Sequence, residues 1–185
     1  INRELRPADR SIAMLALIVA GEAVFFLPFV LPRIFRPTLL EVFHLTNLQL
    51  GIAFAVYGVV AMLAYFPGGP LADRFSARKL MSFALVATSI GGFALATIPS
   101  LAALKVLYGF WGVTTILLFW APLIRATRAW GGAKLPGRAF GILDGGRGLV
   151  AAAIGSGAVA LFSLLMPAEV QNATLDQRAD ALRQV

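Results

Sequence analysis

Five long apolar stretches alternate with short polar segments along the 185 residues of this chain. Each stretch is close to the roughly 20 apolar residues that cross a hydrocarbon core about 30 Å thick. We expect each one to be helical, because a helix satisfies its own backbone hydrogen bonds in lipid. The pattern therefore predicts five membrane spans, at about residues 11–31, 48–66, 80–98, 101–123 and 139–166.

The first apolar stretch has a competing interpretation as a secretory signal, because it follows a basic segment. It continues from Ser11 to about Leu31, however, which is longer than the apolar core of a signal peptide. No clear A-x-A-type cleavage site follows it. We therefore interpret it as the first membrane span.

The composition excludes an ordinary soluble domain. Hydrophobic residues make up 59% of the chain and charged residues 14%, against roughly 45–50% and about 25% in average globular proteins. The net charge is +7, and the basic residues lie between apolar runs rather than on one amphipathic face. This distribution favours an embedded protein over a nucleic-acid-binding one. The predicted fold class is an all-α, polytopic transmembrane helix bundle.

Lysine and arginine predict the orientation, because short cytoplasmic loops carry an excess of both. With the N-terminus inside, ten of them lie on the cytoplasmic side and five outside, and Arg147 falls in span five. The inner set is Arg3, Arg6, Arg10, Arg74, Arg78, Lys79, Arg125, Arg128, Lys134 and Arg138. We therefore expect a plasma (inner) membrane protein with a cytoplasmic N-terminus, residues 1–166 being one helical half-domain. Residues 167–185, with Asn172, would form an external loop leading to a sixth helix beyond this sequence.

The polar segment between spans two and three, Gly68–Lys79, carries the most specific motif. Gly69, Leu71, Asp73, Arg74, Arg78 and Lys79 resemble the loop signature G-x-L-a-D-R-x-x-x-R-K of the major facilitator superfamily of secondary transporters. The alternative is an ordinary basic cytoplasmic loop. The resemblance implies two six-helix halves that rock about a midplane site, with five helices of the N-terminal half present here. It also implies that Gly69, Asp73, Arg74 and Arg78 form a conformational latch against the C-terminal half.

Span one carries the first candidate site residue. Glu22 and Arg33 share a predicted helical face with Phe25, Phe26 and Phe29. Intramembrane carboxylates mark proton or solute pathways by default, although Glu22 has the alternative of pairing with a basic group on another span. Arg33 either faces the site or extends to the membrane interface. Pro28 and Pro32 should loosen the helix between them.

Span four offers Tyr108, which shares a face with Lys105, Gly109 and Gly112. This pattern resembles the superfamily's fourth-helix motif R-x-x-q-G-x-g, with Lys105 in place of the arginine and Tyr108 in place of the glutamine. The resemblance implies a substrate-contacting role for Tyr108. An interfacial lysine at the start of a helix is the alternative.

Span five carries Asp144 and Arg147 beside a stripe of small residues, which we expect another helix to approach closely. The stripe is Gly141, Gly145, Gly148, Ala152 and Gly155. Both charges lie either inside the membrane or at its inner interface. In the organophosphate-antiporter branch, which this segment resembles, a fifth-helix N-x-x-H motif faces the substrate. Asp144 and Arg147 would occupy its asparagine and histidine positions.

These features favour a secondary active transporter for a small organic anion, coupled to protons or to a counter-anion. Guanidinium groups on Arg33 and Arg147 suit carboxylate or phosphate. The alternatives are a proton-coupled exporter of amphipathic or cationic drugs, centred on Glu22 and the phenylalanines, and a non-transporting assembly subunit. We expect no enzyme, cofactor or resident metal, because the chain has no cysteine, no P-loop and His44 alone as histidine. The expected partners are the lipid bilayer, the solute, protons and the C-terminal half, but no nucleic acid.

Overall fold

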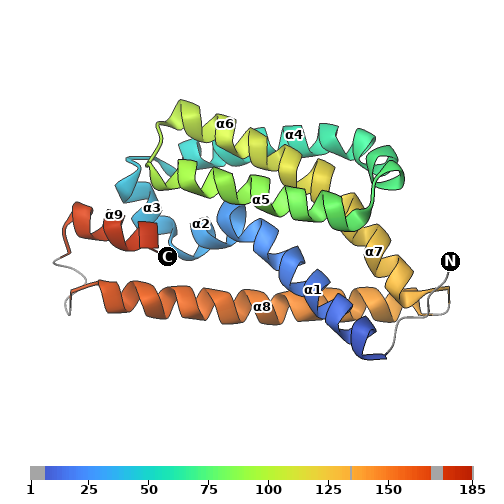
Figure 1. Cartoon of the computed structure of the whole chain (residues 1–185). Helices are drawn as coiled ribbons and strands as arrows, with labels where there is room; N and C mark the ends of the chain where they lie inside the picture. The colour runs from blue at the N-terminus through green and yellow to red at the C-terminus, as the bar shows by residue number, and fades with distance from the viewer. Residues whose placement is uncertain (1–6, 134, 168–172, 185) are drawn as a thin grey trace.

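Every regular element in the described part of the chain is a helix (Figure 1). The computed structural model describes residues 7–133, 135–167 and 173–184. Within them, five helical stretches are long and apolar enough to cross a membrane: Asp9–Ile34, Asn47–Arg74, Ala77–Ala96, Leu101–Gly131 and Pro136–Leu165. The predicted all-α transmembrane bundle is confirmed. Arg3, Arg6, Lys134 and Asn172 lie outside the described residues.

Two prolines shape the first span. Pro28 and Pro32 have no backbone N–H, so the carbonyls of Val24 and Pro28 lose the donors that an α-helix would give them. The backbone responds by widening into a π-helical segment between the two α-helical parts, and the predicted loosening is confirmed. The three parts are α1 (Pro7–Phe25), η1 (Phe26–Val30) and α2 (Leu31–Ile34).

The second span runs further than its apolar stretch. Helix α4 (Asn47–Arg74) starts at a capping box formed by Thr46 and Gln49 and continues through Pro67 and Pro70. The expected polar loop at Gly68–Lys79 is therefore mostly helical, because proline and glycine are tolerated in membrane helices whose ends find other donors. One such donor is the Arg125 guanidinium, which bonds the Ala72 carbonyl near the end of α4.

The third span, α5 (Ala77–Ala96), begins directly after the short turn at Phe75 and Ser76. The Ser76 hydroxyl accepts a hydrogen bond from the Lys79 N–H, which caps the new helix. Gly69, Asp73 and Arg74 thus lie on the last turns of one helix, and Arg78 lies on the first turn of the next.

The fourth span is also interrupted by a π-helical segment. It consists of α6 (Leu101–Gly112), η2 (Val113–Trp120) and α7 (Ala121–Gly131). Buried hydroxyls accompany the change: Thr115 donates to the Trp111 carbonyl at 2.6 Å, and Thr88 donates to the Thr114 hydroxyl at 2.8 Å. The Tyr57 hydroxyl lies 2.8 Å from the Thr115 oxygen. These bonds tie α4 and α5 to the widened part of span four.

The fifth span, α8 (Pro136–Leu165), runs along one side of the bundle, whereas α4, α5 and α6 lie together on the other (Figure 1). Helix α1 crosses between them and contacts α8.

Two glycines of α8 lie in close contacts with the first span. An added Cβ would be 2.9 Å from Ile18 Cγ1 at Gly146, and 2.9 Å from Ile34 Cδ1 at Gly155. Gly141, Gly145 and Gly148 of the predicted stripe face open space among the described residues. Of the glycines in that stripe, only Gly155 lies in a close helix contact.

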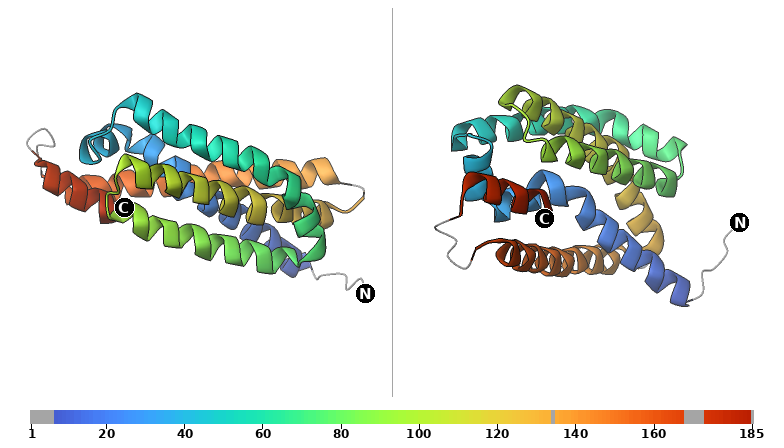
Figure 2. Two further views of the ribbon diagram at one scale, coloured as in Figure 1. Left: turned by 90° about the horizontal axis from the view of Figure 1, so that it is seen from above. Right: turned by 60° about the vertical axis from the view of Figure 1, so that its left-hand side comes forward.

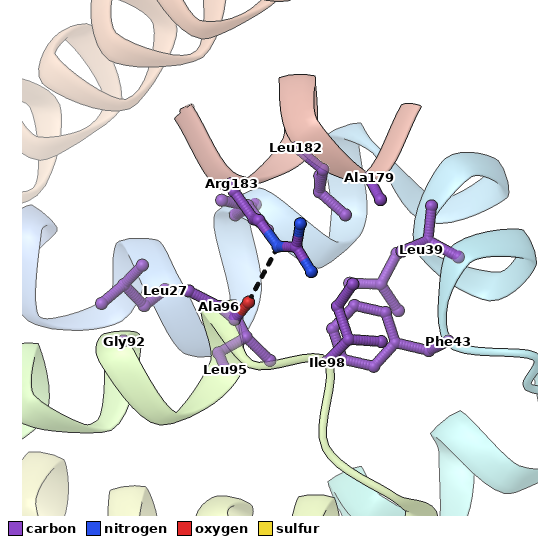
Figure 3. A pocket seen from close by; sticks show the side chains of 12 residues that line it. Leu27, Leu39, Phe43, Gly92, Leu95, Ala96, Ile98, Ala179, Leu182 and Arg183 are labelled. Carbon is purple, nitrogen blue, oxygen red and sulfur yellow. Dashed lines mark hydrogen bonds between the residues drawn. The ribbon is translucent and has the colours of Figure 1, made fainter. Parts of the chain in front are cut away.

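Two short helices pack together at one end of the bundle, α3 (Arg36–Val42) and α9 (Leu175–Gln184), opposite the start of α1 (Figures 1 and 2). Arg178 of α9 forms an ion pair with Glu41 of α3. Arg183 Nε donates to the Ala96 carbonyl at 3.1 Å, which ties α9 to the end of α5. An apolar pocket lies beneath α9, between Leu27, Phe43 and Leu182 (Figure 3). The segment interpreted as an external loop thus contains a docked amphipathic helix.

Candidate functional site

A charged pair joins the first and fifth spans in the middle of the bundle. Arg147 Nε of α8 lies 3.5 Å from Glu22 Oε2 of α1. Glu22 is only 7% exposed, and it is the one buried carboxylate among the described residues. The structure therefore realises the alternative that Glu22 pairs with a basic group on another span, and that partner is itself a predicted site residue.

Two aromatic rings flank the Arg147 guanidinium. Its Cζ lies 5.6 Å from the Phe25 ring centroid and 5.7 Å from that of Trp120. The two rings meet edge to face at 6.0 Å. A guanidinium within about 6 Å of an aromatic face is attracted by the ring quadrupole, more strongly where water is excluded. Spans one, four and five thus hold one cation between them.

A glycine makes room for this arrangement on the first span. A Cβ added to Gly21 would lie 3.1 Å from Arg147 Cδ and 3.4 Å from its Nε. That distance is tighter than a normal contact, so a side chain at position 21 would push the arginine stem away. The missing side chain of Gly21 therefore sets how closely Arg147 approaches Glu22.

The guanidinium keeps unused hydrogen-bonding capacity. Its buried Nε has no hydrogen-bond partner among the described residues. Asp144 approaches Nη1 at 3.6 Å, but its side chain is 68% exposed. Both carboxylate contacts are longer than the roughly 2.7–2.9 Å of a strong charge-assisted hydrogen bond, and neither is a bidentate fork. Arg147 is therefore held in place without its donors being saturated.

No ion pair, hydrogen bond or ring contact joins the remaining two predicted site residues, Arg33 and Tyr108, to Glu22 or Arg147. Arg33 is exposed in α2, and no ion pair or hydrogen bond joins its side chain to another described residue. Tyr108 is 1% exposed, and its hydroxyl donates to the Pro28 carbonyl at 3.0 Å. Their predicted contact with substrate stays a prediction.

The predicted latch residues lie together at the turn between α4 and α5. Gly69, Asp73, Arg74 and Arg78 are all exposed, and none forms an ion pair with a described residue. An added Cβ at Gly69 would meet nothing within 4 Å. This surface is open within the described chain, and its role as a latch stays a prediction.

Sequence reasoning missed Trp120 and Gly21. A π-helical turn bonds each residue five positions on rather than four, so η2 shifts the phase of everything after it. Trp120 is the last residue of that segment, so α-helical spacing counted from Tyr108 does not predict which way the Trp120 side chain points. Gly21, next to Glu22, carried a signal that a close approach was possible, but no helix partner was evident from the sequence alone.

Comparison with known proteins identifies the family. Residues 12–167 match the Major Facilitator Superfamily. The chain belongs to this superfamily. The resemblance of the Gly68–Lys79 segment is thereby confirmed, whereas assignment to the organophosphate-antiporter branch stays a prediction.

Proteins similar to this chain occur in Escherichia coli and Mycoplasma pneumoniae. It is 32% identical to the inner membrane protein YihN of Escherichia coli over 80% of this chain and 35% of YihN. It is 30% identical to the inner membrane protein YqcE of E. coli over 73% of this chain and 32% of YqcE. An uncharacterized MG294 homologue of Mycoplasma pneumoniae is 32% identical over 60% of this chain and 26% of its own length. No solved structure is significantly similar.

These findings confirm the expected location, a multi-pass protein of the inner membrane. The chain spans about a third of the length of the two E. coli relatives. The side of the membrane on which the N-terminus lies stays a prediction from the positive charges.

Proposed function

We propose that this chain forms part of a secondary active transporter that moves a small organic anion by alternating access. Family membership supports the transport activity. The anionic nature of the solute rests on one observation: Arg147 is positioned by two rings and a buried carboxylate, yet no hydrogen bond joins its guanidinium to another described residue. In this proposal Arg147 is the main substrate-binding residue.

A planar guanidinium binds carboxylate or phosphate with two parallel hydrogen bonds, which a lysine does not reproduce. In the structure Glu22 meets the Nε edge at 3.5 Å, so it does not occupy both prongs of the fork. The exposed Asp144 approaches only Nη1. An incoming anion would displace the weak Asp144 contact and pair with the Nη groups.

We propose that Glu22 couples the transport of the anion to protons. When Glu22 and Asp144 are both ionised, the two carboxylates and the Arg147 guanidinium have a net charge of −1, which repels an incoming anion. A proton on buried Glu22 removes the nearer negative charge and releases Arg147 for the solute. The proton and the anion would then bind together and cross together, as in a symporter.

The alternative, an exporter of cationic drugs, uses the same phenylalanines and Glu22. A buried carboxylate beside aromatic rings is a suitable cation site in general. Here Arg147 already occupies the space over Phe25 and Trp120 and the edge of Glu22. A cationic solute would have to displace this fixed charge, so the geometry favours the anion.

Ligand binding to the intact protein in lipid nanodiscs tests the sign of the solute charge. We expect sugar phosphates or short dicarboxylates to raise its melting temperature, and tetraphenylphosphonium to leave it unchanged. Stabilisation by the cation alone would replace our proposal with the exporter. The assigned site also requires that Arg147→Ala abolish stabilisation by the anions, whether sugar phosphates or dicarboxylates.

A further inference from the structure

A hydrogen bond from another span reaches the proline break in the first span. Pro32 has no N–H, so the Pro28 carbonyl has no α-helical donor. The Tyr108 hydroxyl supplies one at 3.0 Å, from a position that is 1% exposed. A buried carbonyl without a partner is costly, and in lipid no water can replace the lost donor. Tyr108 therefore satisfies the group that the break leaves open.

A continuous row of aromatic rings leads from this bond to the charged site. Tyr108 contacts Phe54 with ring centroids 5.1 Å apart, and Phe54 lies 5.8 Å from Phe29. Phe29 lies 6.4 Å from Phe25, whose ring faces the Arg147 guanidinium at 5.6 Å. Close-packed rings transmit a displacement, because there is no free volume to absorb it.

The break is also close to the site along the first span. Pro28 follows Glu22 by six residues, about 9 Å along a helix axis. The π-helical segment η1 begins at Phe26, directly after the ring that covers Arg147. We therefore expect a change in the widened turn to alter how Phe25 and Glu22 face α8.

We propose that the Tyr108 hydroxyl is a positioning group: it fixes the proline break of span one, and thereby the placement of Glu22 and Phe25 beside Arg147. In this proposal Tyr108 acts through the first span, a role that would replace its predicted contact with the solute. The effect on the break stands on the geometry alone, whereas the effect on anion binding rests on the proposed function.

Tyr108→Phe tests this inference, with Tyr57→Phe as its matched control. Both changes keep a buried ring and remove a hydroxyl bonded to another helix, but the Tyr57 partner is Thr115 in η2 rather than the proline break. Amide hydrogen exchange of the intact protein in nanodiscs reports on residues 22–35 without any ligand. We expect about two- to tenfold faster exchange there for Tyr108→Phe, the range expected for one net hydrogen bond, and no change for Tyr57→Phe.

Equal exchange in both variants, whether raised or unchanged, would overturn the inference, because the hydroxyl would then be an ordinary packing contact. Anion affinity gives the second measurement. We expect it to fall several-fold in Tyr108→Phe and to stay at the wild-type value in Tyr57→Phe. Faster exchange with unchanged affinity would refute the positioning of the site. If the wild-type protein binds no anion, the proposed function fails while the exchange comparison still decides the role of Tyr108 at the break.

Discussion

Glu22 and Arg147 face each other across the first and fifth spans with their nearest charged atoms 3.5 Å apart, and they form no hydrogen bond. The distance is short enough for strong attraction in a medium of low polarity. It is long enough that the guanidinium keeps its donors for another partner. The first two predictions below follow from this incomplete pairing.

Arg147→Ala should weaken anion binding by about 2–5 kcal/mol, the usual cost of truncating one partner of a buried charge pair. Arg147→Lys should have a smaller effect, because it keeps the charge and loses the fork. Arg138→Ala is a matched control, since Arg138 is an exposed arginine on the same helix. Calorimetric titration of the intact protein with the anion measures all three. Unchanged affinity in Arg147→Ala would show that the residue is not part of the binding site.

Glu22→Gln should remove the pH dependence of anion binding. In the wild type we expect affinity to rise as the pH falls, because protonation of Glu22 releases Arg147. The glutamine variant mimics the protonated state, so its affinity should be high and nearly independent of pH. Asp144→Asn, at the exposed end of the same group, should retain most of the wild-type pH dependence. Titrations at several pH values check this, and an unaltered profile in Glu22→Gln would eliminate proton coupling through this residue.

Asp73→Asn should slow transport several-fold and leave equilibrium affinity for the solute within about a factor of two. The reason is that Asp73 is exposed at the end of α4, and the family resemblance implies that it stabilises one access state. Comparing uptake rates in proteoliposomes with binding constants separates the two quantities. A large loss of affinity with normal turnover would contradict the latch.

The positive charges predict that the α4–α5 turn faces the cytoplasm and that α9 faces outside. The structure places the two at opposite ends of the bundle (Figure 1), so one cysteine at each end tests the orientation. The chain has no cysteine of its own. In intact cells, Asp176→Cys should react with an impermeant maleimide and Ser76→Cys should not. Labelling at position 76 from outside would show that the predicted orientation is reversed.

Gly91→Ala should destabilise the fold by about 1–3 kcal/mol, which is typical of overpacking. An added Cβ would lie 3.0 Å from Trp111 Cε2 and 3.1 Å from Leu107 Cδ1. Trp111 is fully buried and donates to the Thr88 carbonyl at 3.1 Å, so it has little room to move. Gly58→Ala, where nothing lies within 4 Å, should change stability by less than about 1 kcal/mol. Thermal unfolding in detergent compares the two, and equal melting temperatures would argue against the tight contact.

The sequence by itself determined the fold class, the family and the approximate position of five spans. These are local properties: the length of an apolar stretch matches the membrane, and the family motif at Gly68–Lys79 is continuous in the chain. The ends of the spans were less well defined. Helix α4 continues to Arg74, and Arg125, distant in sequence, donates to the Ala72 carbonyl near its end.

Only the tertiary structure decided which candidate residues meet. Glu22 and Arg147 were predicted separately, and their pairing depends on α1 crossing α8 with Gly21 at the contact. Two π-helical segments shift the helical phase, so a face extrapolated from Glu22 no longer predicts where Arg33 lies, and Trp120 reaches Arg147 without any signal in its spacing. Tyr108 donates to the Pro28 carbonyl, whose α-helical donor is missing because Pro32 has no N–H, and only the packing of spans one and four brings this donor to it.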